Sequence, residues 1–163
     1  MVATTDEIGS AIEIESISWQ RGTTGNTSSS DYGNFRIYLG YCPEDFLGTT
    51  FIDNYITNTR TLVHQSVTES ISVDEGEWFT IELDSPFWYN GVENMIMEIV
   101  WDTGTGDPSI YGFNTPMTPT SLKSASSTGE IGFLSSMRCQ FMLNGTQQLE
   151  NGTFASVKVL LGQ

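Results

Sequence analysis

The sequence predicts an all-β protein: a two-sheet antiparallel β-sandwich with jelly-roll or Greek-key connections. Short stretches that alternate apolar and polar residues, as strands do, recur along the chain. Segments rich in Gly, Pro and Asn separate these stretches, and no segment shows the capped, sustained period of a helix. These patterns together favour many short strands over helices.

The length of 163 residues suits a single domain, 1–163, with one hydrophobic core. We expect a core module over about 11–144 and an extra C-terminal strand within 145–163. Aromatic residues make up 12% of the chain, which is high for a disordered protein, so we expect an ordered fold. The 16 glycines and 5 prolines follow no period, which excludes collagen-like and repeat architectures.

The acidic composition excludes some partners. Twenty acidic side chains against six basic ones give a net charge of −14. Because binding to a phosphate backbone requires clustered Lys and Arg, and the six are scattered, we expect no nucleic-acid partner. No apolar run reaches the roughly 18 residues of a membrane-spanning helix, so we expect no membrane insertion. The acidity favours either solubility or cation binding.

The N-terminal half contains three expected strands. Alternation begins at Ile12, and its inward phase shifts by one residue before Ile17, so we expect a β-bulge near Ser16. Segment 34–40 is the second strand, with Phe35, Ile37 and Leu39 on one face. Segment 43–58 is irregular with a helical turn at 45–47, and a strand at 61–67 follows.

In the C-terminal half, strands alternate with turn-rich segments. A strand at 77–83 turns Phe79, Ile81 and Leu83 inward. Segment 85–91 has turn chemistry, because Pro presets φ and Asn-Gly permits positive φ. A nearly all-apolar strand at 95–101 belongs in the middle of a sheet. The remaining expected elements are a polar loop at 102–108, a short aromatic segment at 109–113, a polar loop at 116–129, a strand at 137–143, a turn at 144–145 and a final strand at 154–161.

Four of these segments carry a family resemblance. Asn34-Phe-Arg-Ile-Tyr-Leu-Gly40, the block 76–91, Asn94-Met-Ile-Met-Glu-Ile99 and Met137-Arg-Cys-Gln-Phe-Met-Leu143 follow one another in the order of a known module. The chain resembles the jelly-roll-like β-sandwich modules of large secreted bacterial surface and adhesin proteins that carry C-terminal secretion-sorting domains. The resemblance spans roughly 12–144. It implies an extracellular or cell-surface location and a non-catalytic role in carbohydrate binding or adhesion.

Two features depart from that module. Trp88 occupies a position that is variable and often small or polar in the module. Segment 147–163 extends beyond its expected end, either as an extra strand of this domain or as a strand that pairs with a neighbouring molecule.

The aromatic pair in the expected connection, Trp88 and Tyr89, is the main candidate for ligand binding. Sugar-binding proteins stack flat aromatic rings on the apolar faces of pyranose rings. Tyr89 occupies a packing position in the resembling block, so Trp88 should point outward. Tyr41 and Tyr111 are candidates for the same surface. The alternative is that these rings serve only local packing.

The loop that runs from Asp102 to Asp107 is the best candidate for a metal site. Calcium binds several oxygens, which come from carboxylates and from the carbonyl groups of Gly-rich loops. The loop supplies two carboxylates, which are too few without a contribution from Asp31, Glu44 or Asp45. The alternative is an ordinary acidic turn.

The sequence does not predict an enzyme. No GxSxG motif is present, and a single histidine, His64, gives little support to a catalytic triad. Cys42 and Cys139 lie outside any CxxC motif, and form either a disulfide or two free thiols.

We therefore expect a non-catalytic extracellular module that binds a polysaccharide or surface glycan. The alternative is a structural subunit of a surface fibre, which self-associates when strand 154–161 completes the sheet of a neighbour.

Overall fold

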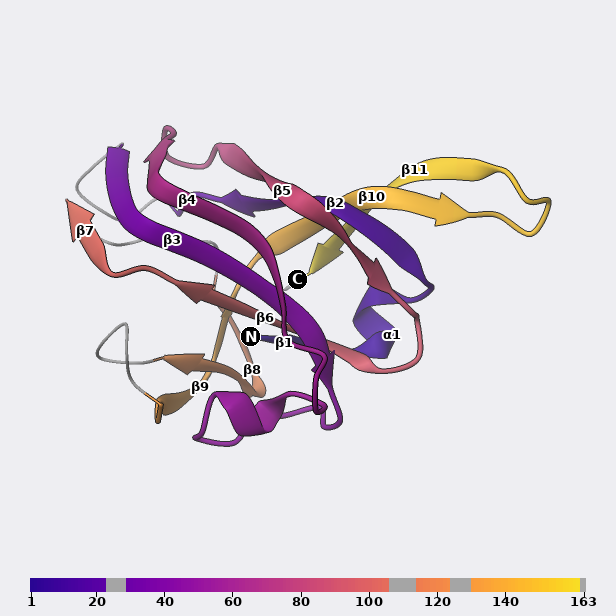
Figure 1. The fold of residues 1–163 in the computed structure, drawn as a ribbon, viewed down its shortest axis with the longest axis horizontal. Helices are drawn as coiled ribbons and strands as arrows, with labels where there is room; N and C mark the ends of the chain where they lie inside the picture. The colour runs from indigo at the N-terminus through magenta and orange to yellow at the C-terminus, as the bar shows by residue number, and fades with distance from the viewer. Residues whose placement is uncertain (23–28, 106–113, 124–129, 162–163) are drawn as a thin grey trace.

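A computed structural model describes residues 1–22, 29–105, 114–123 and 130–161 of the chain. Two antiparallel sheets pack against each other, which confirms the all-β sandwich (Figure 1). Sheet A contains, in spatial order, β1 (Val2–Ala3), β6 (Asn94–Val100), β3 (Ser29–Cys42) and β4 (Thr61–Ser72), and β7 (Thr103–Thr105) also pairs with β3. Sheet B contains, in spatial order, β11 (Phe154–Leu161), β10 (Phe141–Gln148), β2 (Ile12–Gln20) and β5 (Trp78–Tyr89).

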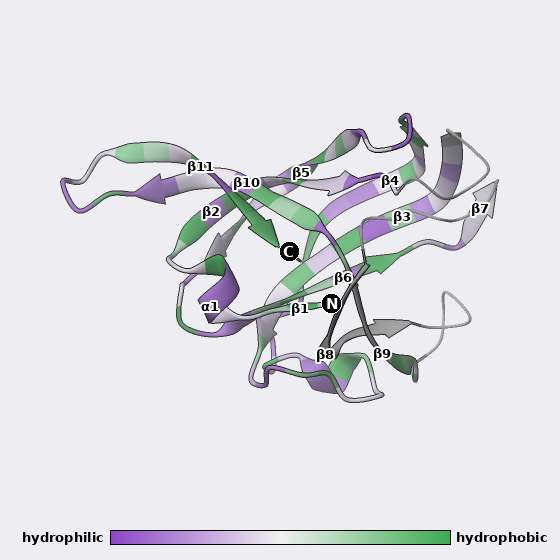
Figure 2. Cartoon of the chain, turned by 180° about the vertical axis from the view of Figure 1, so that it is seen from behind, coloured by the Kyte–Doolittle hydropathy of each residue, from purple (hydrophilic) through white to green (hydrophobic). Residues whose placement is uncertain are grey.

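Three smaller elements flank the sandwich. A separate hairpin consists of β8 (Asn114–Lys123) and β9 (Phe133–Cys139). A short helix, α1 (Thr5–Ile8), and a 3-10 turn, η1 (Ile52–Asn54), complete the fold. The β10–β11 hairpin extends past the other strands in both views (Figures 1 and 2).

The connectivity contains a Greek key. Strands β3, β4 and β5 follow one another in space, and β6 returns to lie beside β3. The step from β4 to β5 crosses from sheet A to sheet B. At this seam the backbone N–H of Gln65 in β4 donates a 2.7 Å hydrogen bond to Asp84 Oδ2 of β5. The expected Greek-key type of connection is therefore present.

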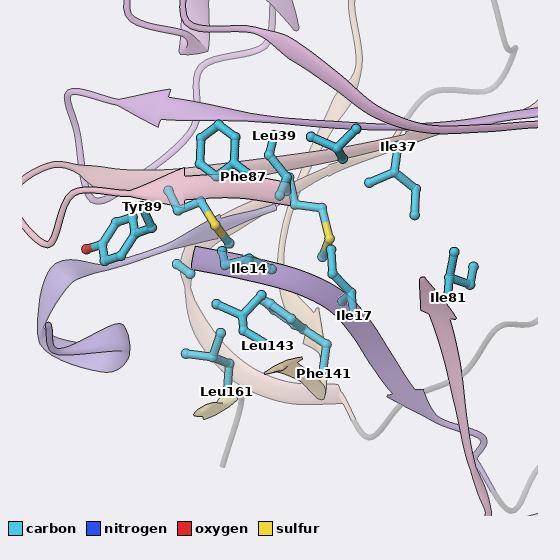
Figure 3. Packing of buried hydrophobic residues seen from close by; sticks show 14 of the residues in the cluster. Ile14, Ile17, Ile37, Leu39, Ile81, Phe87, Tyr89, Phe141, Leu143 and Leu161 are labelled. Atoms are coloured by element: carbon cyan, nitrogen blue, oxygen red, sulfur yellow. The ribbon is translucent and has the colours of Figure 1, made fainter. Parts of the chain in front are cut away.

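The core forms where the inward faces of the two sheets meet (Figure 3). The predicted inward set Phe35, Ile37 and Leu39 is fully buried, each with 0% exposure. The expected bulge near Ser16 is confirmed, because the pairing of β2 with β5 shifts register between Ile14 and Ser16. The bulge keeps apolar side chains inward on both sides of the shift, since one extra residue restores the alternation.

Several predicted turns and loops are strands in the structure. Segment 85–91 was expected to be a turn, but β5 runs to Tyr89, and only residues after it turn. The loop expected at 102–108 contains β7, and the loop expected at 116–129 contains β8. The aromatic segment expected at 109–113 lies outside the described residues. β5 and β7 pair with the distant strands β2 and β3, and β8 pairs with the next strand, β9, so strand pairing overrides local turn chemistry in these three places.

The end of the chain differs in a related way. The strand expected at 137–143 is divided between β9 and β10, and the turn expected at 144–145 lies within the continuous strand β10, opposite the bulge at Glu15 of β2. The chain reverses instead at 149–153, where Gly152 has a positive φ of 80°. The helical turn expected at 45–47 is found at 52–54.

Both ends of the chain belong to the sandwich. The final strand is confirmed, and all eight residues of β11 pair with β10, from Phe154 to Leu161. Val2, Ala3 and Ile8 are buried near the N-terminus. The folded unit therefore includes residues on both sides of the expected core module, 11–144.

Candidate functional site

The outer face of sheet B, which is turned away from sheet A, carries the exposed tryptophan of the predicted site. Phe87 and Tyr89 are buried in the core (Figure 3). Trp88, which lies between them in the strand, is 53% exposed. This alternation follows from the strand geometry of β5, in which successive side chains point to opposite faces. The structure thus corrects the expected connection to a strand, and places Trp88 outward and Tyr89 inward as expected.

The backbone of Trp88 is hydrogen-bonded to a tyrosine of sheet A. Its own carbonyl oxygen accepts a 2.7 Å hydrogen bond from the Tyr41 hydroxyl of β3. The Tyr41 ring packs against Phe87, with centroids 5.7 Å apart, and against Tyr89, with centroids 6.4 Å apart. Tyr41 and Tyr89 therefore support Trp88 from beneath and do not form a shared stacking surface with it.

Tyr89 is fully buried, with 0% exposure. Its hydroxyl is buried and has no hydrogen-bond partner among the described residues. Burial raises the pKa of Tyr89 to about 12, and the charges of Tyr41 and Glu93 act in the same direction. The fourth predicted residue, Tyr111, lies outside the described residues.

Polar residues of neighbouring strands lie on the same face of sheet B as Trp88. Glu13 of β2 is directly opposite Trp88, and Thr146 of β10 is opposite Glu13. In a neighbouring row, Ser16 lies between Glu82 of β5 and Asn144 of β10. The face therefore combines one large aromatic ring with carboxylate, hydroxyl and amide groups.

Part of this polar surface is a hydrogen-bonded ladder. The Ser18 and Thr80 hydroxyl oxygens are 2.7 Å apart, and Asn144 Nδ2 donates to Ser18 Oγ at 2.9 Å and to Ser16 Oγ at 3.3 Å. The sequence does not predict this ladder, because Asn144-Gly145 is expected to form a turn. The alternation of β2 could have indicated that Ser16 and Ser18 face outward, but only the fold brings Asn144 beside them.

The predicted calcium loop has a different arrangement. Asp102 Oδ1 accepts a 2.7 Å hydrogen bond from Arg36 Nη2, and Oδ2 accepts a 3.1 Å bond from Asn34 Nδ2. Of the acids considered as helpers, Asp31 accepts a bond from Ser70, and Asp45 accepts one from Asn94. Asp107 lies outside the described residues. Within the described ranges, no group of three or more His, Cys, Asp or Glu side chains is arranged to hold a metal ion. Calcium binding stays a prediction.

The single histidine and the two cysteines are the remaining chemically reactive side chains. His64 is nearly buried, and its Nε2 is 3.2 Å from Glu69 Oε2 while its Nδ1 is 3.4 Å from Asp84 Oδ1. It thereby links β4 to β5 at the seam between the sheets. Cys42 and Cys139 are free thiols, which decides between the two alternatives for this pair.

Comparison with known proteins gives no relative from which a role could be transferred: no family model, curated protein or solved structure matches the chain. Among the described residues, no helix is long and apolar enough to cross a membrane.

Proposed function

We propose that the chain is a non-catalytic extracellular module that binds a polysaccharide or surface glycan through the outer face of sheet B. Trp88 is the stacking platform in this proposal. The observation that carries it is the 53% exposure of an indole whose two neighbours in the strand are buried in the core. An aromatic ring held in this way offers an apolar face to a ligand at little cost in conformational entropy.

The polar groups around Trp88 support a glycan over a purely apolar ligand. A pyranose ring has apolar C–H faces and an equatorial rim of hydroxyls, so a site needs an aromatic ring together with hydrogen-bonding groups. Glu13, opposite Trp88, and Glu82, beyond the register shift on the same face, are exposed carboxylates that accept hydrogen bonds from hydroxyls. A neutral glycan fits this acidic face better than a polyanion, because the chain carries a net charge of −14.

Glycan-array screening followed by calorimetric titration of the best ligand tests the proposal. Trp88→Ala should weaken binding by about thirtyfold or more, the cost of about 2 kcal/mol that is typical of a central aromatic contact. Phe46→Ala is the matched control, since Phe46 is an aromatic residue of similar exposure, 54%, on the segment before η1. Glycan binding that is equally strong in wild type and Trp88→Ala would refute the site. Absence of binding to every glycan would refute the function.

The alternative function, a fibre subunit joined by exchange of the C-terminal strand, has less support. β11 pairs along its whole length with β10 of its own chain. An exchange would first have to break this pairing and expose the half-buried Val157 and Val159, which pack against the core. We therefore retain glycan binding as the proposed function.

A further inference from the structure

β11 is an edge strand without the usual protection against pairing. In the part of the chain that the structure describes, β10 is its only partner in sheet B, and the hairpin extends past the body of the sandwich (Figures 1 and 2). Natural edge strands are commonly interrupted by Pro, bulges or several charges. β11 contains no Pro, pairs with β10 without a register shift, and has a single charged residue, Lys158.

The other long edges are occupied or shortened. β5 bulges away from β2 between Glu82 and Phe87 and contacts β4 through Asp84. The edge of sheet A beyond β6 is occupied by β1, which has only two residues. The opposite edge of sheet A is β4, which shifts register against β3 between Ile37 and Tyr38 and is in contact with β5. β11 is thus the one long, regular edge among the described strands.

The turn that joins β10 to β11 identifies the free backbone groups of β11. The Leu149 amide donates to the Thr153 carbonyl at 2.8 Å, so these two residues form a hydrogen-bonded pair. Hydrogen-bonded pairs recur at every second residue of an antiparallel ladder. Residues 155, 157, 159 and 161 therefore direct their N–H and C=O groups to β10. Residues 154, 156, 158 and 160 direct theirs to the open edge.

These free groups fit a second copy of the same strand in one register. Two β11 strands that pair antiparallel about a two-fold axis must join residues of the open-edge set to each other. An axis at Val157 satisfies this condition. It places Phe154, 68% exposed, opposite Leu160 of the second copy, 36% exposed, and Ser156 opposite Lys158 of the second copy.

The neighbouring registers are less favourable. An axis at Lys158 would set two Lys side chains directly opposite each other, and like charges opposite each other are destabilising. An axis at Ser156 would place Phe154 opposite Lys158 and leave Leu160 beyond the paired segment. The Val157 register alone both matches the two exposed apolar side chains and separates the two lysines.

We propose that the open edge of β11 pairs antiparallel with β11 of a second copy of this chain, about a two-fold axis at Val157. Sheet B then continues across both molecules. The proposal is independent of glycan binding. The net charge of −14 opposes association at low ionic strength, so added salt strengthens it. A contact of this size falls in the weak, transient class, below about 1,200 Å² of buried surface.

Sedimentation velocity over a range of protein and NaCl concentrations tests the pairing. A reversible species of twice the 18.0 kDa chain mass should form at high concentration and increase with salt. Ser156→Pro removes an open-edge N–H without touching the bonds to β10, and Pro is tolerated at such edge positions. It should weaken association by about thirtyfold, because two backbone hydrogen bonds disappear from each dimer. Ser156→Ala is the matched control and should associate like wild type.

A single cysteine tests the register. Val157→Cys should form a covalent dimer under mild oxidation, since residues opposite each other in a non-hydrogen-bonded pair are within reach of a disulfide. Ser156→Cys is the control, because its side chain lies opposite Lys158 and not opposite itself. A monomer under all conditions would overturn the proposal. So would association that survives in a folded Ser156→Pro variant, or equally fast cross-linking of the two cysteine variants.

Discussion

Replacement of Gly145 tests the close approach of β10 to β2 beside the bulge at Glu15. A Cβ atom at Gly145 would overlap the carbonyl oxygen of Glu13 and would lie 2.9 Å from its carbonyl carbon and 3.1 Å from Ile14 Cα. All three atoms belong to the backbone of β2, so no side-chain rotation can relieve the overlap. Gly145→Ala must therefore push β10 and β2 apart by about 1 Å at this point. A gap of this size removes up to about half of the dispersion attraction between the facing atoms.

The expected cost combines two effects. Overpacking of a tight interior site costs up to about 3 kcal/mol, and each weakened backbone hydrogen bond adds about 1 kcal/mol. We expect Gly145→Ala to lower the free energy of unfolding by about 3–4 kcal/mol. With a urea dependence of about 2 kcal/mol per M, the unfolding midpoint should fall by about 1.5–2 M.

Gly76→Ala is the control for this measurement. Gly76 has a positive φ of 78°, and an added Cβ would have no atom within 4 Å. Only backbone strain acts there, at about 1–2 kcal/mol. If Gly145→Ala lowers the urea midpoint no more than Gly76→Ala does, the close approach of β10 to β2 is refuted and the turn interpretation of 144–145 regains support.

Three further predictions concern charge and thiol chemistry. Burial raises the pKa of Tyr41, Tyr55 and Tyr89, that of Tyr89 to about 12, from an ordinary value of 10.0. The unfolded chain thus loses these protons near pH 10.0, while the folded protein keeps them. The free energy of unfolding, measured in urea, should therefore be highest below that pH and fall toward pH 12. The fall should be less steep in Tyr89→Phe. Glu98 accepts two bonds from Arg60 and one from Tyr55 with its side chain 14% exposed, so Glu98→Gln should cost about 2 kcal/mol in the same assay. Asp102→Asn should cost less than about 1 kcal/mol, because its pair with Arg36 is 33% and 41% exposed, and equal costs would contradict this ranking. Both cysteines should react with a thiol reagent in denatured protein without reductant. In folded protein, Cys42 should react more slowly than Cys139, because Cys42 is buried and burial raises the pKa of its thiol. A disulfide-linked peptide in a non-reducing digest would refute the free-thiol state.

The strands that could be predicted are those with strong apolar alternation. Segments 12–20 and 34–40 place every second residue in the core, and one face of each strand must be buried for the sheets to pack. The alternation even revealed the bulge near Ser16, because a change of phase within one strand requires an extra residue. Prediction failed where turn-forming residues lie inside strands.

The candidate site shows the same division. The outward direction of Trp88 was expected because its neighbour Tyr89 occupies a packing position in the module that the chain resembles, and Trp88 is exposed while Tyr89 is buried. The support from Tyr41, the carboxylate of Glu13 opposite the indole, and the ladder through Asn144 come from strands that are distant in the sequence. No local pattern could bring them together.

By itself, the sequence determined the class of fold and the inward faces of its main strands, since these depend on the period of side chains along a strand. Only the tertiary structure decided that Asn144-Gly145 and Pro86 lie within strands. It also decided that both carboxylate oxygens of Asp102 accept hydrogen bonds, from Asn34 and Arg36, and that β11 pairs with β10 of its own chain and leaves its other edge open. These features depend on which strands become neighbours. Turn residues, acids and edge strands acquire their roles from partners far along the chain, and burial of a common core selects those partners.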